Sequence, residues 1–174
     1  MNTVARYRMT QIGTWMLFAS NLGLVTASAA GVGVVLLGHM GLLGHVERLM
    51  LVCWLVSLAA PLFLLWFPES SARNLMVASI GCSLVAAGGG LLPGVCGLAS
   101  TFLSLGFMVS ASVHIGCHDL ADHFAGVGRG YLWTLGLAVA GLLVPPLVMA
   151  AAVVFLLAGL RYLAALASLA RRMA

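Results

Sequence analysis

The chain has 174 residues, of which 63% are apolar and 7% charged, whereas a soluble domain carries about 25% charged residues. A soluble chain of this kind would have too few charges to cover its surface, so the composition excludes an ordinary soluble protein and indicates one that faces lipid. The net charge of +4 comes from arginines and acidic residues spread over termini and loops, which excludes the clustered basic patch of a nucleic-acid-binding protein.

Apolar segments without Asp, Glu, Lys or Arg follow one another along the chain. At about 1.5 Å per residue, each covers a hydrocarbon core of about 30 Å within the usual tolerance. They lie at about residues 12–38, 49–67, 75–92, 95–115 and 131–160. The sequence therefore predicts one domain, residues 1–174: an all-α integral membrane protein, built as a bundle of about five transmembrane helices with short loops and a C-terminal helical extension.

The first segment begins after Arg6 and Arg8, and its Ala27-Ser28-Ala29 stretch resembles a signal-peptidase site. The apolar run nevertheless continues to Leu37, which makes it long enough to span a bilayer. We therefore expect an uncleaved first helix.

Prolines and glycines mark places where these helices can bend or break. Pro61 lacks the N–H that would bond to the carbonyl of Ser57, so in lipid that carbonyl needs another partner. The stretch Gly88–Gly94 permits either a tight hairpin between two full spans or a break in a pair that does not cross. The pair Pro145-Pro146, in the middle of the last segment, permits a static kink, a hinge or a re-entrant pair.

The arginines leave the orientation of the chain open. With five spans and a cytoplasmic N-terminus, four arginines lie on each side, so the positive-inside rule favours neither orientation. Arg171 and Arg172 would prefer the cytoplasm, which a re-entrant pair at Pro145-Pro146 would allow. We place the N-terminus inside and the protein in a plasma or inner membrane.

Most of the polar side chains in the connections gather between His114 and His123. If the fourth helix continued past the membrane interface, His114, His118 and Asp122 would lie four residues apart and share one face. Two imidazoles and a carboxylate can hold a divalent ion such as zinc, with His123 as a further ligand. The spacing thus predicts a metal site at the interface, against the alternative of solvated side chains that bond to one another or to lipid headgroups.

The spans lack the acidic residue or Lys that many proton-coupled carriers keep in the membrane. Small residues recur four apart in several spans and allow close helix contacts. We therefore expect a non-catalytic subunit or scaffold of a membrane complex, whose partners are lipid, other membrane subunits or further copies of itself. Two alternatives stay open: a metal-binding membrane protein, hydrolytic or not, that uses His114, His118 and Asp122, and a channel or carrier for an uncharged small molecule.

Overall fold

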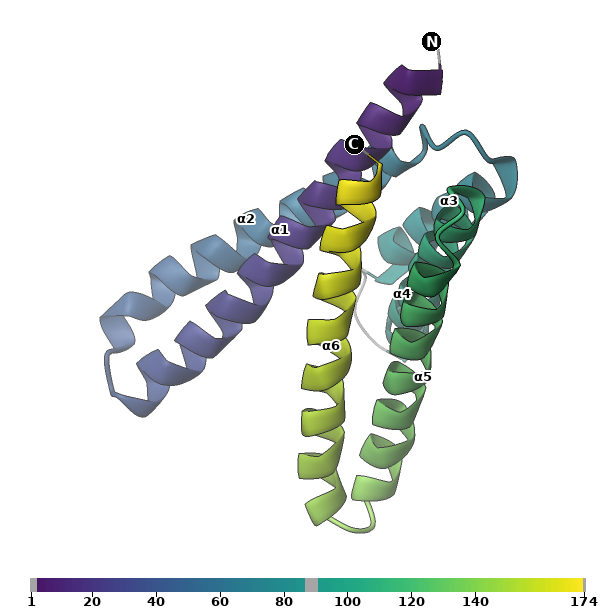
Figure 1. Ribbon diagram of the computed structural model, residues 1–174. Coiled ribbons are helices and arrows are strands. Elements are labelled where there is room, and N and C mark those ends of the chain that lie inside the picture. The colour runs from purple at the N-terminus through teal and green to yellow at the C-terminus, as the bar shows by residue number, and fades with distance from the viewer. Residues whose placement is uncertain (1–2, 87–90, 174) are drawn as a thin grey trace.

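The computed structural model describes residues 3–86 and 91–173, and the regular elements of these residues are all helical. In chain order they are α1 (Thr3–Leu36), the short 3-10 helix η1 (Met40–Leu42), α2 (Leu43–Leu64), α3 (Ser70–Ala86), α4 (Leu91–His114), α5 (His118–Gly141) and α6 (Pro146–Arg172). They pair as three antiparallel hairpins, α1–α2, α3–α4 and α5–α6 (Figure 1). The prediction of an all-helical fold is confirmed for the described residues.

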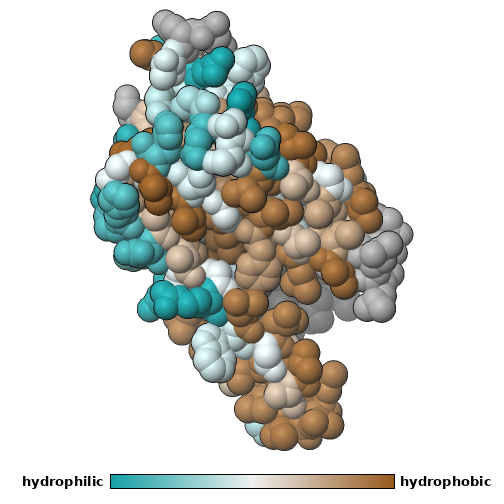
Figure 2. All heavy atoms as spheres, turned by 90° about the vertical axis from the view of Figure 1, so that its right-hand side faces the viewer, coloured by the Kyte–Doolittle hydropathy of each residue, from teal (hydrophilic) through white to brown (hydrophobic). Residues whose placement is uncertain are grey.

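Stretches of four helices among the described residues are long and apolar enough to cross a membrane, by length and composition. They are Thr3–Gly31, Leu43–Leu64, Val95–His114 and Pro146–Arg172. Figure 2 shows hydrophilic residues gathered toward the end that holds the N-terminus, while hydrophobic residues cover the lower part of the same face. On this face, apolar side chains thus cover the lengths of the helices that could lie in a membrane.

The segment 131–160, which the sequence predicts as one span, is divided between two helices. Helix α5 ends at Gly141, and α6 begins at Pro146 after Pro145 at its N-cap. Neither proline has an N–H to donate, and each ring crowds the preceding turn, so the two adjacent prolines favour a break in the helix at this point. Pro146 instead occupies a first helical position, where a missing N–H costs nothing. The chain reverses here, so one continuous fifth helix is wrong, and the two termini lie toward the same end of the molecule (Figure 1).

The other doubtful boundary is seen only in part. The run Gly88–Gly90 lies outside the described residues, but α3 ends at Ala86 and α4 begins at Leu91. The two helices run antiparallel and pack along each other (Figure 1). The chain therefore reverses direction between Ala86 and Leu91, which excludes one continuous helix through this region.

The buried core lies near the end that holds the termini, where the three hairpins meet. Phe67, which follows α2, is fully buried, and its ring packs edge-on against Tyr7 of α1 and Phe107 of α4, with ring centroids 6.0 and 5.7 Å away. The side-chain amide of Gln11 donates a hydrogen bond of 2.9 Å to the carbonyl of Ala170, which joins α1 to α6. These contacts hold the first and last helices together at one end.

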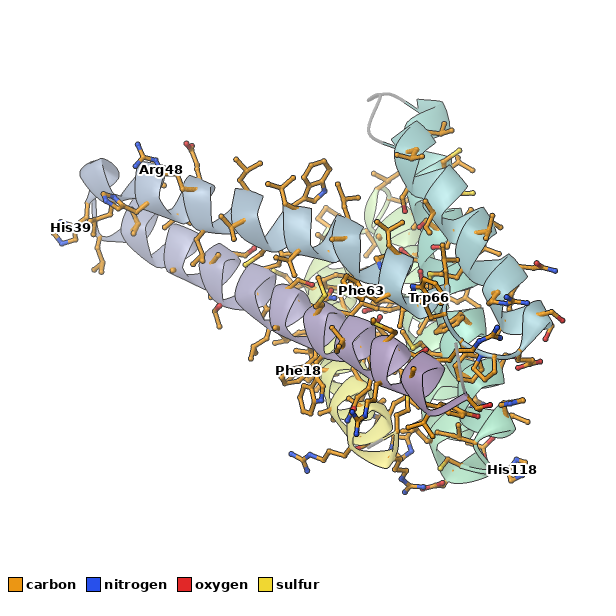
Figure 3. All side chains as sticks on the ribbon, turned by 90° about the horizontal axis from the view of Figure 1, so that it is seen from above. Phe18, His39, Arg48, Phe63, Trp66 and His118 are labelled. Carbon is orange, nitrogen blue, oxygen red and sulfur yellow. The ribbon has the colours of Figure 1, made fainter. Side chains whose placement is uncertain are left out.

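The α1–α2 hairpin diverges from the other four helices beyond this core (Figure 1). Its two helices approach closely at Gly23, because glycine has no Cβ. A Cβ added there would lie 2.4 Å from the sulfur of Cys53. The far end of the hairpin carries His39 and Arg48, which lie away from the rest of the bundle (Figure 3). The predicted close contact through small residues is therefore present between α1 and α2.

Candidate functional site

The polar stretch predicted as a metal site is broken by a helix end. Gly116 has a φ of +76°, which glycine adopts without strain. The N–H of Cys117 donates to the carbonyl of Ser112 (2.8 Å) and the N–H of Gly116 to that of Val113 (2.9 Å), the pair of bonds that defines a Schellman motif. Helix α4 thus ends at His114 and α5 starts anew at His118. The prediction that His114, His118 and Asp122 share one helical face is therefore wrong.

His114 belongs to a contact between α2, α3 and α4 instead. Its ring packs edge-on against Phe67, with centroids 5.4 Å apart, and its Nδ1 lies 3.9 Å from Oε2 of Glu69. The Glu69 carboxylate also accepts hydrogen bonds from the hydroxyls of Ser110, at 3.0 Å, and Ser71. Glu69 therefore ties the α2–α3 connection to the end of α4.

The three other predicted ligands lie exposed on the first turns of α5. His118 points away from the bundle (Figure 3), and Asp122 and His123 are exposed as well. Within the part of the chain that the structure describes, no three His, Cys, Asp or Glu side chains are placed to hold a metal ion. The metal site stays a prediction without geometric support, which the metal content of wild type compared with His118→Ala would test.

Asp119, one residue further, forms the clearest ion pair at this end. Its Oδ2 and Oδ1 accept hydrogen bonds of 2.9 and 3.2 Å from the guanidinium of Arg172, in the two-pronged geometry that arginine favours. The hydrogen bond from Arg172 holds the pKa of the Asp119 carboxyl below its usual value of 3.8. His123 takes no part in this ion pair, since its Nδ1 lies 3.2 Å from the backbone oxygen of Asp119. The pair links the start of α5 to the end of α6.

A cavity of about 740 Å³ lies among the helices, and residues from α1 to α6 all contribute to its lining. None of the lining residues carries a charge. Apolar walls come from residues such as Leu17 of α1, Leu58 of α2 and Leu105 of α4. Hydroxyl groups and the amide of Asn21 supply the polar surface. An apolar cavity with a few converging polar groups is the usual form of a small-molecule site.

Four serines form the polar wall of this cavity between α3 and α4. The Ser79 hydroxyl donates to the Ser100 carbonyl (3.0 Å) and lies 3.0 and 2.8 Å from the hydroxyls of Ser100 and Ser104. The Ser83 hydroxyl lies 2.6 Å from that of Ser100. Each hydroxyl has one donor and two acceptor positions, so this network keeps acceptor capacity for a bound molecule.

The α5–α6 side of the cavity is aromatic. Tyr131 and Thr134 of α5 and Phe155 and Tyr162 of α6 line it. The Tyr131 and Phe155 rings pack with centroids 5.7 Å apart. Each tyrosine combines an apolar ring with a hydroxyl, so this wall can contact apolar parts of a ligand and still bond to a polar group.

Ser57 and Pro61 of α2 lie at the same cavity. Because Pro61 has no N–H, the carbonyl of Ser57 lacks its normal helical donor. A second cavity of about 380 Å³ adjoins this wall and shares Ser57, Ser83 and Ser100 with the first. The freed carbonyl predicted from the sequence thus belongs to a residue that borders both cavities.

Sequence reasoning found Ser57 but missed the serine network. The signal was present, since Ser79 and Ser83 are four residues apart, and so are Ser100 and Ser104 on the next apolar segment. Residues spaced by four share one face of a helix. Two such pairs on neighbouring antiparallel helices predict a row of polar side chains between the helices. That this row borders a cavity is seen only in the packed structure.

Comparisons of the chain with models of protein families, with curated proteins and with solved structures found no match. Function must therefore be inferred from the residues and geometry of this chain.

Proposed function

We propose that the protein is a multi-pass membrane protein whose central cavity binds an uncharged small molecule and carries it through the bundle. The observation that supports this most directly is the cavity of about 740 Å³, lined from every α-helix and free of charged side chains. Its volume falls within the range of about 300–1,000 Å³ typical of ligand sites. The second cavity beside Ser57 and Ser100 extends the same polar wall.

The lining favours a neutral molecule for a physical reason. An ion entering an apolar interior loses its hydration, and no charged lining residue is present to compensate. A neutral hydroxyl or amide N–H can exchange its water partner for an acceptor position left on the hydroxyl of Ser83 or Thr134 at little cost. Apolar parts of the same molecule would contact Leu58, Leu105 and the aromatic wall.

A swelling assay on liposomes that contain the purified protein tests this proposal. The probes are a graded series of uncharged polyols and amides, with sodium chloride as the charged comparison. We expect at least one uncharged probe to enter faster than into protein-free liposomes, while the salt does not. Equal entry of every uncharged probe with and without protein would contradict the proposal.

A pair of neighbouring substitutions connects such flux to the cavity. Ala138 lines the cavity, whereas Val139 is 59% exposed and is not among its lining residues. Ala138→Phe should fill part of the space and reduce flux, while Val139→Phe adds a ring on the outside and should leave flux unchanged. Equal flux through both variants would show that the solute takes another route.

A second candidate function, a subunit or self-associating scaffold of a membrane complex, is favoured by the divergent α1–α2 hairpin. Beyond the core this hairpin leaves the other helices (Figure 1), and side chains such as Leu51, Val52 and Leu55 are more than half exposed. The mass of the purified particle, corrected for detergent, tests this candidate. A mass above the 18.0 kDa of one chain, or a constant partner, is expected; a bare single chain would contradict it.

A further inference from the structure

The surface of the α5–α6 hairpin changes character halfway along its length. Arg129 and Arg161 are exposed and are the last charged residues before the turn on their helices. They lie at nearly the same level, because Gly130 packs directly against Ala158 of the facing helix. Between these arginines and the termini, the exposed side chains are mainly polar, charged or alanine.

Beyond the two arginines, the exposed surface of the hairpin is apolar. Trp133, close to this boundary, is 71% exposed, as an aromatic residue at a membrane interface would be. At the turn, Leu142 and Leu143 are 83% and 88% exposed. The turn and its flanks, from Leu142 to Val148, contain only leucine, valine and proline. A turn that emerged into water would place its most apolar side chains in solvent.

The α1–α2 connection shows what an emerging turn looks like in this chain. It carries His39, and the first turns of α2 that follow carry His45, Glu47 and Arg48. The α5–α6 turn differs in composition, since no Asp, Glu, Lys, Arg or His lies between Arg129 and Arg161. One hairpin of the molecule therefore has a far end suited to water, and the other has a far end suited to hydrocarbon.

The backbone of the α5–α6 turn is also satisfied in the way that hydrocarbon demands. The N–H groups of Leu142, Leu143 and Val144 all donate to the carbonyls of Val139 or Ala140 at 3.0–3.1 Å. After the turn, the N–H groups of residues 147 and 148 donate to the carbonyls of residues 144 and 145 at 2.9 and 3.0 Å. The two prolines between have no N–H. Every backbone donor from residue 142 to 148 is thus paired or absent, as lipid requires and water does not.

Helix α6 as a whole is long enough to cross a bilayer, but the charge-free arms of the hairpin beyond the two arginines are not. At about 1.5 Å per residue, the α5 arm from Arg129 to Gly141 is about 18 Å long, and the α6 arm from Pro146 to Arg161 is about 22 Å long. The hydrocarbon core is about 30 Å thick. We infer that α5–α6 is a re-entrant hairpin that enters from the side of the chain termini and ends among the acyl chains. This inference does not depend on the ligand proposed for the cavity.

Labelling of single added cysteines by a membrane-impermeant maleimide tests the inference. The variants are Leu143→Cys, at the turn, and the control Gly41→Cys, at the α1–α2 connection, where an added Cβ meets nothing within 4 Å. The unmodified protein with its native thiols Cys53, Cys82, Cys96 and Cys117 supplies the background. The reagent is added to opened membranes, so that both aqueous sides are reached.

We expect Gly41→Cys to label above background and Leu143→Cys to stay at background until detergent denatures the protein. Labelling of the denatured sample shows that the added thiol is present. If Leu143→Cys in membranes were labelled as fast as Gly41→Cys, the inference would be overturned. Because the reagent reaches both aqueous sides, this outcome does not depend on the side that the turn faces. Leu142→Cys, the neighbouring residue of the turn, is measured in parallel in case one variant fails to fold, and the same outcome applies to it.

Discussion

The Ser79 hydroxyl has three partners across the α3–α4 contact, and its side chain is buried. Ser79→Ala removes all three bonds. Hydrogen bonds between membrane helices contribute on average about 0.6 kcal/mol and at most about 1.7 kcal/mol. We therefore expect the free energy of unfolding to fall by about 0.6–1.7 kcal/mol in Ser79→Ala. Equilibrium unfolding in mixed detergent measures the change.

Ser168→Ala is the matched control, because that hydroxyl donates only to the carbonyl of Ala164 in its own helix. Its effect should stay within about 0.5 kcal/mol. Equal stability losses in Ser79→Ala and Ser168→Ala would show that the network contributes nothing beyond ordinary helix bonds.

The pKa of the Asp119 carboxyl is lowered chiefly by its hydrogen bond from Arg172. Because the pKa is lower in the folded state, ionisation of Asp119 stabilises the fold. This stabilisation is complete at pH values above the unfolded-state pKa of about 3.9, and it is lost as the pH falls through the folded-state pKa. In Arg172→Gln, the pKa of Asp119 should rise toward 3.8. NMR titration of labelled aspartate in micelles measures it. Arg171→Gln removes the same charge one residue away and should raise it less; equal shifts in both variants would mean a general charge effect.

At the scale of the element, Gly141 determines how closely α5 and α6 meet at their turn. A Cβ at this position would lie 2.6 Å from Cγ2 and 3.1 Å from the backbone nitrogen of Val148. Gly141→Ala should therefore destabilise the protein by about 1–3 kcal/mol, the usual cost of overpacking. Thermal unfolding in detergent measures the effect.

Gly136→Ala provides the comparison on the same helix, since an added Cβ there meets nothing within 4 Å. Alanine is the better helix former by about 0.8–1.0 kcal/mol, so this variant should be neutral or more stable. The tight turn would be unimportant if Gly141→Ala were as stable as Gly136→Ala.

At the scale of the whole molecule, the reversal at Pro145-Pro146 changes the balance of charge across the membrane. Five of the eight arginines lie toward the end that holds the termini: Arg6, Arg8, Arg73, Arg171 and Arg172. Arg129 and Arg161 lie halfway along the α5–α6 hairpin, and Arg48 lies at the far end of the α1–α2 hairpin. The equal division of arginines expected from five spans is therefore replaced by a clear excess at one end. By the positive-inside rule, we predict that both termini face the cytoplasm.

Reporter fusions that are active on only one side of the membrane test this orientation. Fusions at the N-terminus and at the C-terminus should both report the cytoplasm, and an insertion at Gly41 should report the opposite side. Termini on different sides would contradict the hairpin arrangement, and termini both outside would contradict the charge rule.

The all-helical fold could be predicted from the amino-acid sequence, and the described residues confirm it. Long charge-free segments dictate helices, because a chain in lipid must satisfy its backbone within each segment. The same reasoning placed a break at Pro145-Pro146, where two donors are missing, but could not choose between a kink and a reversal. A proline removes a hydrogen bond without stating the direction that the chain then takes.

The places where polar groups meet depend on how the helices pack, which the sequence pattern does not give. Helical spacing placed His114 and His118 on one face, but Gly116 ends the helix between them, so the register is lost. The serines of α3 and α4 look ordinary one at a time and become a connected wall only when the two helices pack. Periodicity describes one helix at a time, whereas a cavity is defined by the distances between helices, and those depend on the packing of the whole chain.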